Sequence, residues 1–305
     1  MIPVLVGPTA SGKTAVAHAV ARLADVDIIA ADSRTIYRGL DIGTAKPSAA
    51  ERAAFRYHGL DLVEPQERYA AGRFARDAAC WLQVALVAGR LPLVVGGTGF
   101  YLRALFEGLF DEPPLDDDRR ERLQVVLRRL PAEERLRWVH RLDAGYTGGR
   151  NAQRSSRALE VALLTGRSLS ALQRAAPTPG AAPARYFRIE VPRGVLHERI
   201  AQRGAEMLRA GLLDEVRAAL DRGVPQDAPG LTGVGYREAV LHLEGKLPAA
   251  QLEQAIVQAT RQYAKRQETW FRHQLPAGTE VLDGTLSPDV LASQLLSGYR
   301  AATCG

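Results

Sequence analysis

The sequence predicts an α/β fold in which helices flank a parallel sheet, interrupted by an all-helical insertion. Three observations support this fold class. Short apolar runs alternate with amphipathic segments over the first hundred residues, a glycine-rich loop follows the first apolar run, and the middle of the chain shows only helical periodicity. Two such regions fit a chain of 305 residues.

The first expected strand, Ile2–Val6, runs directly into the signature G-x-x-x-x-G-K-T at 7–14, and a helix is expected over Thr14–Leu23. In this arrangement two glycines let the backbone wrap a diphosphate, a lysine adds a point charge, and a Thr hydroxyl can hold Mg²⁺. The context predicts a P-loop NTPase-like core with a phosphate site. Its expected diphosphate ligands are Gly7, Thr9, Ala10, Ser11, Gly12, Lys13 and Thr14, with Thr14 also the expected metal ligand.

Two further strands are expected to end at the same edge. Val26–Ala30 leads to Asp32, and Leu91–Val95 leads to Gly96-Gly97-Thr98 after a helix around 70–88. Ligands of open parallel sheets lie beyond the carboxyl ends of the strands, so three segments should converge on one site.

The convergence gives Asp32 a choice of roles. A P-loop that transfers a nucleotide phosphoryl group usually pairs with an acidic residue ending a neighbouring strand, but Leu91–Val95 ends in glycines. Asp32 is therefore a general base, a residue that supports a bound magnesium, or only a turn or helix cap.

The middle segment, 113–185, has a different character. Helices are expected over Arg119–Arg129, Glu133–Leu142 and Gln153–Gly166, and the Pro- and Gly-rich stretch 175–184 is expected to be a linker. The segment holds 14 Arg and no Lys against 8 Asp and Glu, whereas the remaining residues carry 26 charges of each sign. Such clustering is typical of a nucleic-acid-binding surface. The preference for 36 Arg over 4 Lys in the whole chain also fits genomic codon bias, which does not explain the clustering.

The core is expected to resume at strand Tyr186–Val191 and to continue through helices at about 194–222 and 249–274, while the last 30 residues predict nothing definite. In the second helix an apolar stripe that includes Trp270 favours core packing. The core is therefore expected over 1–112 and 186–305.

The composition excludes several classes. No apolar run approaches the length of a membrane span, no signal-peptide pattern precedes the first strand, and Cys80 and Cys304 lack metal-site spacing. We expect a cytoplasmic monomer without membrane contact.

Several blocks resemble the bacterial tRNA dimethylallyltransferase family, in order over nearly the whole chain. They are GPTASGKTAVA (7–17), AADSRTIYRGLDIGTAKP (30–47), GRLPLVVGGTGFYLRAL (89–105), QRSSRALEV (153–161), RIAQRGAEMLRAGLLDEV (199–216), GYREA (235–239) and TRQYAKRQETWFR (260–272). One departure is Thr35, where the family more often has Gln.

The resemblance implies transfer of a dimethylallyl group from dimethylallyl diphosphate to N6 of adenine 37, in tRNAs that read codons starting with U. It implies Asp32 as general base, with Lys13, Thr14, Mg²⁺ and Arg203 stabilising the leaving diphosphate. It also implies that the basic insertion grips the anticodon stem-loop. The tRNA-binding residues that it indicates are Asp32, Ser33, Arg34, Thr35, Thr98, Arg120, Gln153, Arg154, Ser155, Ser156, Arg157, Lys265, Arg266 and Gln267.

Three other functions remain open on the residues alone. A small-molecule P-loop kinase or an adenylate isopentenyltransferase would need no basic insertion, and a non-enzymatic RNA-binding P-loop module would leave Asp32 without a task.

Overall fold

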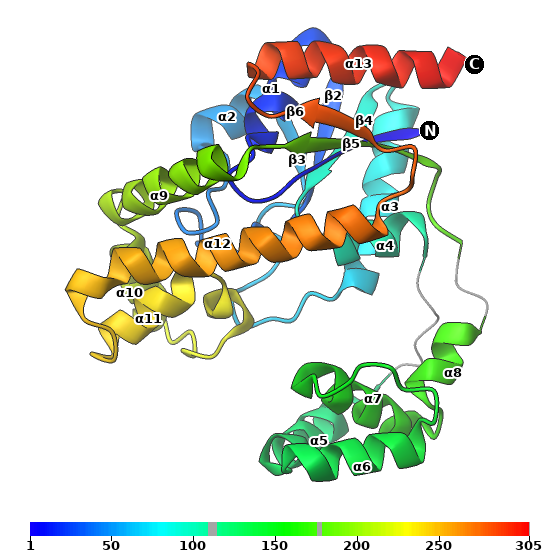
Figure 1. Cartoon of the computed structure of the whole chain (residues 1–305), viewed down its shortest axis with the longest axis vertical. Helices are drawn as coiled ribbons and strands as arrows, with labels where there is room; N and C mark the ends of the chain where they lie inside the picture. The colour runs from blue at the N-terminus through cyan, green and yellow to red at the C-terminus, as the bar shows by residue number, and fades with distance from the viewer. Residues whose placement is uncertain (109–114, 176–178, 305) are drawn as a thin grey trace. The chain divides into compact units, whose positions relative to one another are not determined.

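The computed structural model describes residues 1–108, 115–175 and 179–304, which form two compact units (Figure 1). The first unit comprises Met1–Phe106 and Ala181–Gly305, and the second comprises Glu107–Gly180. The second unit overlaps most of the segment 113–185 in which the sequence predicts an insertion. Residues 111–114, where the pattern of the sequence changes, and residues 176–178 of the expected linker lie outside the described residues.

A six-stranded parallel sheet organises the first unit, as the sequence predicts, in the order β3-β2-β4-β1-β5-β6. The strands are β1 (Ile2–Val6), β2 (Val26–Ala31), β3 (Arg56–His58), β4 (Leu91–Gly96), β5 (Ala184–Glu190) and β6 (Glu280–Asp283). Gly96 of β4 is in register with Val6 of β1 on one side and with Ala31 of β2 on the other. The three segments expected to converge therefore leave adjacent strands at one edge of the sheet.

Helices surround this sheet (Figure 1). Those of the first unit are α1 (Lys13–Leu23), α2 (Ala49–Ala54), α3 (Ala71–Val87), α4 (Gly99–Phe106), α9 (Arg193–Arg209), α10 (Leu212–Asp221), α11 (Tyr236–Leu243), α12 (Ala249–Gln274) and α13 (Pro288–Cys304), with a 3₁₀ turn at Pro229–Thr232. The apolar side chains of β1 are fully buried, as expected of a central parallel strand.

One face of the sheet packs against α1 and α13. Leu5 and Phe187 belong to the same buried cluster as Val16 of α1 and Leu295 of α13. Side chains alternate between the two faces of a strand, so neighbouring residues such as Val4 serve the other face, where α3 contacts β2 and β4. This packing fixes the carboxyl ends of the strands from both sides.

Two expectations for the C-terminal part are wrong. The helix expected over 194–222 is two helices, α9 and α10, because Gly211 between them adopts a φ of 97° that ends the first helix. The last 30 residues, which predicted nothing definite, contribute edge strand β6 and helix α13. The buried side chains of α13, including Leu291 and Leu295, show that this helix completes the core.

The second unit contains four described helices, α5 (Asp117–Arg129), α6 (Ala132–Leu142), α7 (Ala152–Thr165) and α8 (Leu169–Arg174). Leu127, Val139 and Leu159 meet in a small core of their own. Asn151 accepts a hydrogen bond from the Arg154 N–H and caps α7, whereas Gly166 ends it with a φ of 69°. No helix in the described part of the chain has the length and apolar character needed to cross a bilayer.

Candidate active site

The loop between β1 and α1 has the strained backbone that its sequence predicts. Ala10 and Gly12 adopt φ values of 62° and 91°, so the chain reverses direction just before α1 begins at Lys13. Gly7 is tightly enclosed, because a Cβ there would lie 2.7 Å from Ser11 Oγ and 3.2 Å from Ile189 O. The loop therefore opens onto the N-terminus of α1, where backbone N–H groups favour an anion.

The Lys13 ammonium lies folded over this loop. Its Nζ donates to Gly7 O at 2.9 Å and to Pro8 O at 2.7 Å. Burial lowers the pKa of Lys13 to about 8, and the nearby Asp32 carboxylate opposes that shift while Arg203 reinforces it. The lysine is thus placed at the loop and is poised to titrate near neutral pH.

The two hydroxyl groups of the loop have contrasting environments. Ser11 is only 2% exposed, and its Oγ has no hydrogen-bond partner among the described residues. Thr14 is exposed on the first turn of α1. A buried hydroxyl without a partner is uncommon and calls for an explanation by a ligand or by function.

Asp32 follows β2 and is divided between two tasks. Its Oδ1 accepts a hydrogen bond from the Arg34 N–H at 2.8 Å, which is the local turn expected of a capping aspartate. No described residue donates a hydrogen bond to Oδ2. The carboxylate acts on the pKa of Lys13, Arg203, Tyr101 and Tyr263, so it lies at the centre of the site.

Thr98, in the loop after β4, joins this centre. Its Oγ1 accepts from the Ser33 N–H at 3.0 Å and donates to Ser33 Oγ at 3.3 Å. Its backbone N–H donates to Ala31 O at 3.2 Å. The residues after β2 and β4 are therefore bonded into one rim.

Arg203 reaches the same centre from α9. Its guanidinium donates a long hydrogen bond, 3.5 Å, to Thr44 O. Burial lowers the pKa of this guanidinium from its usual value, while Asp32 opposes the shift. Lys13 and Arg203 thus bring two cations to one carboxylate, which is a surplus of positive charge suited to an anionic ligand.

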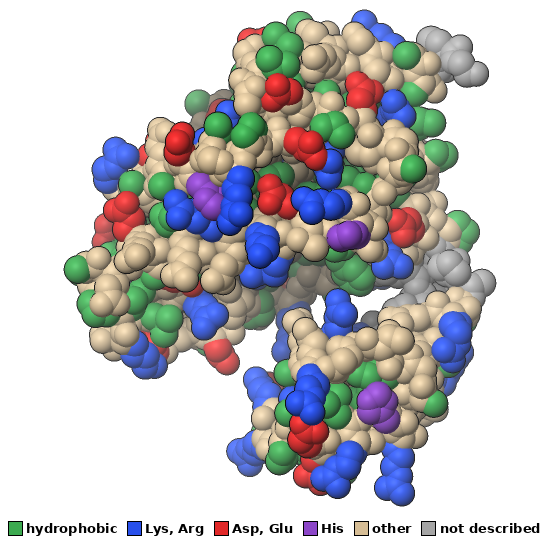
Figure 2. All heavy atoms as spheres, in the orientation of Figure 1, with side chains coloured by type: hydrophobic (Ala, Val, Ile, Leu, Met, Phe, Trp, Pro, Cys, Tyr) green, Lys and Arg blue, Asp and Glu red, His purple; other side chains and the backbone are tan. Residues whose placement is uncertain are grey.

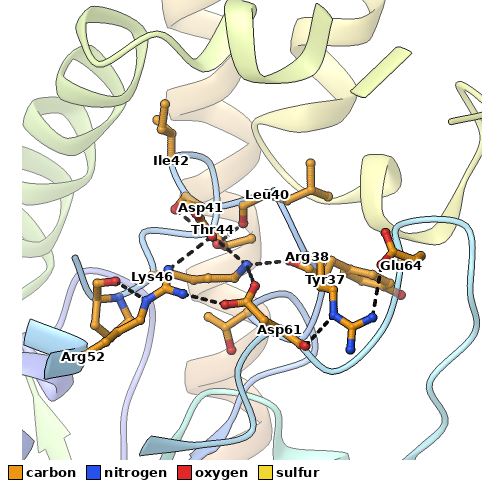
Figure 3. Close-up of polar contacts among 12 residues, drawn as sticks. Tyr37, Arg38, Leu40, Asp41, Ile42, Thr44, Lys46, Arg52, Asp61 and Glu64 are labelled. Atoms are coloured by element: carbon orange, nitrogen blue, oxygen red, sulfur yellow. Dashed lines mark hydrogen bonds and ion pairs between the residues drawn. The ribbon is translucent and has the colours of Figure 1, made fainter. Parts of the chain in front are cut away.

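The segment that presents Thr44 is held by a buried ion cluster (Figure 3). The side chain of Lys46 is completely buried, and its Nζ contacts Asp41 Oδ1 at 2.7 Å and Asp61 Oδ1 at 2.6 Å. Arg52 bridges the same two carboxylates at 3.3 and 2.5 Å. Two cations and two anions therefore fix the inner side of residues 41–46.

Glu215 of α10 fixes the other side of this segment. Its carboxylate accepts from the backbone N–H groups of Asp41, Ile42 and Gly43 at 2.6, 2.9 and 3.3 Å. The hydroxyl of Tyr236 donates to the same carboxylate at 2.5 Å. Gly43 has no room for a side chain, because a Cβ would lie 2.5 Å from the Tyr236 ring.

Helix α12 separates the expected tRNA-binding residues. Lys265 and Arg266 are exposed, and Arg266 stacks 5.7 Å from the centre of the Tyr263 ring. Burial raises the pKa of Tyr263 to about 12. Gln267 is only 6% exposed and bonds to the protein, not to solvent: its Oε1 accepts from the Thr9 N–H at 2.8 Å and its Nε2 donates to Gly97 O at 2.9 Å. We therefore correct its expected role as a tRNA contact.

Other expectations also change. Trp270 packs against α4, where a Cβ on Gly99 would lie 2.3 Å from its ring, in agreement with the expected packing role. Thr35 is 8% exposed, with its Oγ1 directed at Asp32 O at 3.5 Å, so its side chain is not presented as a base contact. Arg34, a further expected contact, donates to Pro229 O at 2.8 Å.

The basic helices of the second unit contain a mixture of exposed and committed side chains. On the face shown in Figure 2, Lys and Arg side chains dominate the charged surface of this unit. Arg120 and Arg157 both pair with the buried carboxylate of Glu160, Arg120 at 2.6 Å. Ser155 is 1% exposed and accepts from Arg135 at 3.1 Å. We therefore correct the expected tRNA contacts at these three positions, while Gln153 and Arg154 are exposed and Ser156 is half-buried.

Sequence reasoning missed Glu215, Tyr236, Lys46 and Tyr263 as parts of the site. Glu215 and Tyr236 lie in matched blocks, but nothing local in the sequence shows that they meet a loop more than 170 residues earlier in the chain. Lys46, one of four lysines in an arginine-rich chain, carried a signal that was overlooked.

Comparison with known proteins agrees with this geometry. The family model described as IPP transferase matches residues 35–274, and one described as isopentenyl transferase matches residues 1–61. A tRNA dimethylallyltransferase of Xylella fastidiosa is 43% identical over 288 residues, covering 90% of each chain. One of Deinococcus radiodurans is 41% identical and covers 97% of this chain and 95% of its own.

Solved structures show the same fold. A tRNA delta(2)-isopentenylpyrophosphate transferase from Staphylococcus epidermidis superposes with a TM-score of 0.70 at 27% identity, over 99% of both chains. A eukaryotic dimethylallyltransferase acting on tRNA, at 23% identity, shares the fold with a TM-score of 0.72 over 93% of this chain and 73% of its own. On its matched length and its identity to these relatives, the chain belongs to the IPP transferase family.

Proposed function

We propose that this chain transfers a dimethylallyl group from dimethylallyl diphosphate to N6 of adenine 37 in tRNAs that read codons starting with U. One observation carries the proposal in a member of this family: Lys13, Arg203 and Asp32 meet at the ends of adjacent strands. Two cations suit a departing diphosphate, and one carboxylate suits the acceptor amine.

The leaving group would lie in the loop at 7–14. As the carbon–oxygen bond breaks, negative charge grows on the diphosphate, and cations placed in advance stabilise it. Lys13 would exchange its two carbonyl partners, Gly7 O and Pro8 O, for phosphate oxygens. A phosphate oxygen would also supply the partner that the buried Ser11 hydroxyl lacks.

Asp32 would act on the acceptor. The exocyclic amine of adenine is a weak nucleophile because its lone pair is delocalised into the ring. The carboxylate oxygen that receives no hydrogen bond from a described residue would accept the proton that the amine loses. The target adenine has to leave its stack to reach this rim, at a cost of a few kcal/mol.

Magnesium fits this site as a companion of the substrate. Mg²⁺ is commonly bound by one or two protein groups together with substrate phosphates, and the exposed Thr14 hydroxyl is an oxygen donor of the right kind. When bound, the ion would neutralise charge on the diphosphate.

The tRNA would be held by exposed groups of each unit. Lys265 and Arg266 of α12 and Gln153 and Arg154 of α7 are free to contact RNA phosphates or bases. We also propose that the chain acts as a monomer in the cytoplasm, which light scattering and cell fractionation would test.

An acceptor assay tests the function. Labelled dimethylallyl diphosphate is offered with unmodified tRNA, with the same tRNA carrying guanosine at position 37, and with AMP. We expect transfer to unmodified tRNA only, because guanosine has a carbonyl in place of the amine. Transfer to AMP at a comparable rate would instead indicate a free-nucleotide enzyme.

A further inference from the structure

Gln267 lies between the two halves of the site and touches both. Helix α12 carries its side chain to the loop after β1, where Oε1 accepts the Thr9 N–H at 2.8 Å. The same amide donates from Nε2 to Gly97 O, in the loop after β4, at 2.9 Å. Because β1 and β4 are adjacent, this one amide joins the loops that follow two neighbouring strands.

Only an amide of this length satisfies both partners. One of them is a donor and the other an acceptor, so a carboxylate or an ammonium would match just one. The space is also closed: a Cβ on Gly97 would lie 2.3 Å from Gln267 Nε2. The glycine after β4 therefore has a local reason, which is to admit this side chain.

The two bonded loops face different parts of the proposed reaction. Thr9 belongs to the loop that would hold the diphosphate. Gly97 precedes Thr98, which is bonded to Ser33 next to Asp32. The Gln267 amide thus connects the loop of the leaving group to the rim of the general base through a short chain of hydrogen bonds.

We propose that Gln267 is a positioning residue that sets the separation between the diphosphate loop and the acceptor rim. The inference rests on the proposed prenyl transfer and adds to it a residue that touches neither substrate. Attack on an allylic carbon requires the acceptor amine and the leaving oxygen to lie on opposite sides of that carbon. A misplacement of about 1 Å can cost about 10²-fold in rate.

The test compares Gln267→Met and Gln267→Glu with Gln258→Glu, a control on an exposed position of the same helix. We expect both Gln267 variants to lower the single-turnover rate about 10- to 100-fold while tRNA affinity changes less than about twofold. The control should keep the wild-type rate. In Gln267→Glu the rate should recover as the pH falls from about 8 to about 6, because burial raises a carboxyl pKa and the protonated group can again donate to Gly97 O.

A purely structural role predicts a lower melting temperature without this pH-dependent recovery, and that result would overturn the proposal. Rates within about twofold of wild type in both variants would also overturn it. Loss of tRNA affinity in proportion to rate would return Gln267 to the tRNA interface.

Affinity for inorganic pyrophosphate, measured on the same proteins, separates this inference from the proposed function. Gln267→Met should bind pyrophosphate less tightly than wild type, since the loop loses its anchor at Thr9. If the wild type transfers no prenyl group but this difference persists, the proposed function fails and the positioning role stands. Unchanged pyrophosphate affinity in an active enzyme contradicts the positioning role alone.

Discussion

The pKa of Lys13 predicts how binding of dimethylallyl diphosphate depends on pH. A lysine binds an anion strongly only while it is protonated. With a pKa of about 8, Lys13 is about nine-tenths protonated at about pH 7 and about one-tenth protonated at about pH 9. If only the protonated form binds, the apparent dissociation constant rises about tenfold over this interval. The affinity is therefore highest below the pKa and falls above it.

Equilibrium binding of the substrate to the free enzyme, followed across this pH range at constant ionic strength, measures the effect. Lys13→Ala provides the control, because its weaker affinity should vary only with ionisation of the diphosphate itself. An affinity that is constant in the wild type, or that rises with pH, would refute the assignment of Lys13. A fall of equal size in Lys13→Ala would attribute the dependence to another group.

Four further outcomes are expected. Lys13→Ala should abolish transfer with tRNA affinity nearly intact, and filter binding showing an equal loss of tRNA would contradict the division of roles. Asp32→Asn should lower the single-turnover rate by at least about 10²-fold with little change in diphosphate binding, and a rate within a few-fold of wild type would reduce Asp32 to its capping role. Arg154→Ala should reduce the slope of log K for tRNA against log salt by about 0.7 to 0.9, and an unchanged slope would place this side chain away from RNA. Lys46→Met should destabilise the protein by about 3 kcal/mol in urea unfolding because it leaves buried carboxylates short of a cation, and unaltered stability would show that Arg52 suffices.

The parallel core could be predicted because its signals are local. An apolar strand, a G-x-x-x-x-G-K-T loop and an amphipathic helix lie next to each other in the sequence, so the start of the sheet follows from one short segment. The helix break at Gly211 could not be read in the same way, since a helix tolerates an isolated glycine and only the backbone conformation shows that it ends there.

Long-range partners explain what the sequence did not show in the site. Glu215 and Gln267 each bind backbone groups of a loop far away in the chain, and backbone groups leave no trace in side-chain patterns. In the same way, Arg157 shares a helical face with exposed residues, but the buried Glu160 one turn later claims it. Matching blocks identified these segments without separating ligand contacts from structural supports.

The central claim is that the loop at 7–14 grips a prenyl diphosphate and that no nucleotide is consumed. The most direct measurement is the ratio of released pyrophosphate to modified adenine, with magnesium present and ATP omitted. The bond that breaks joins carbon to oxygen, so we predict one pyrophosphate for each modified adenine. Turnover that required ATP, or that released phosphate from it, would contradict the prenyl transfer even if tRNA bound tightly.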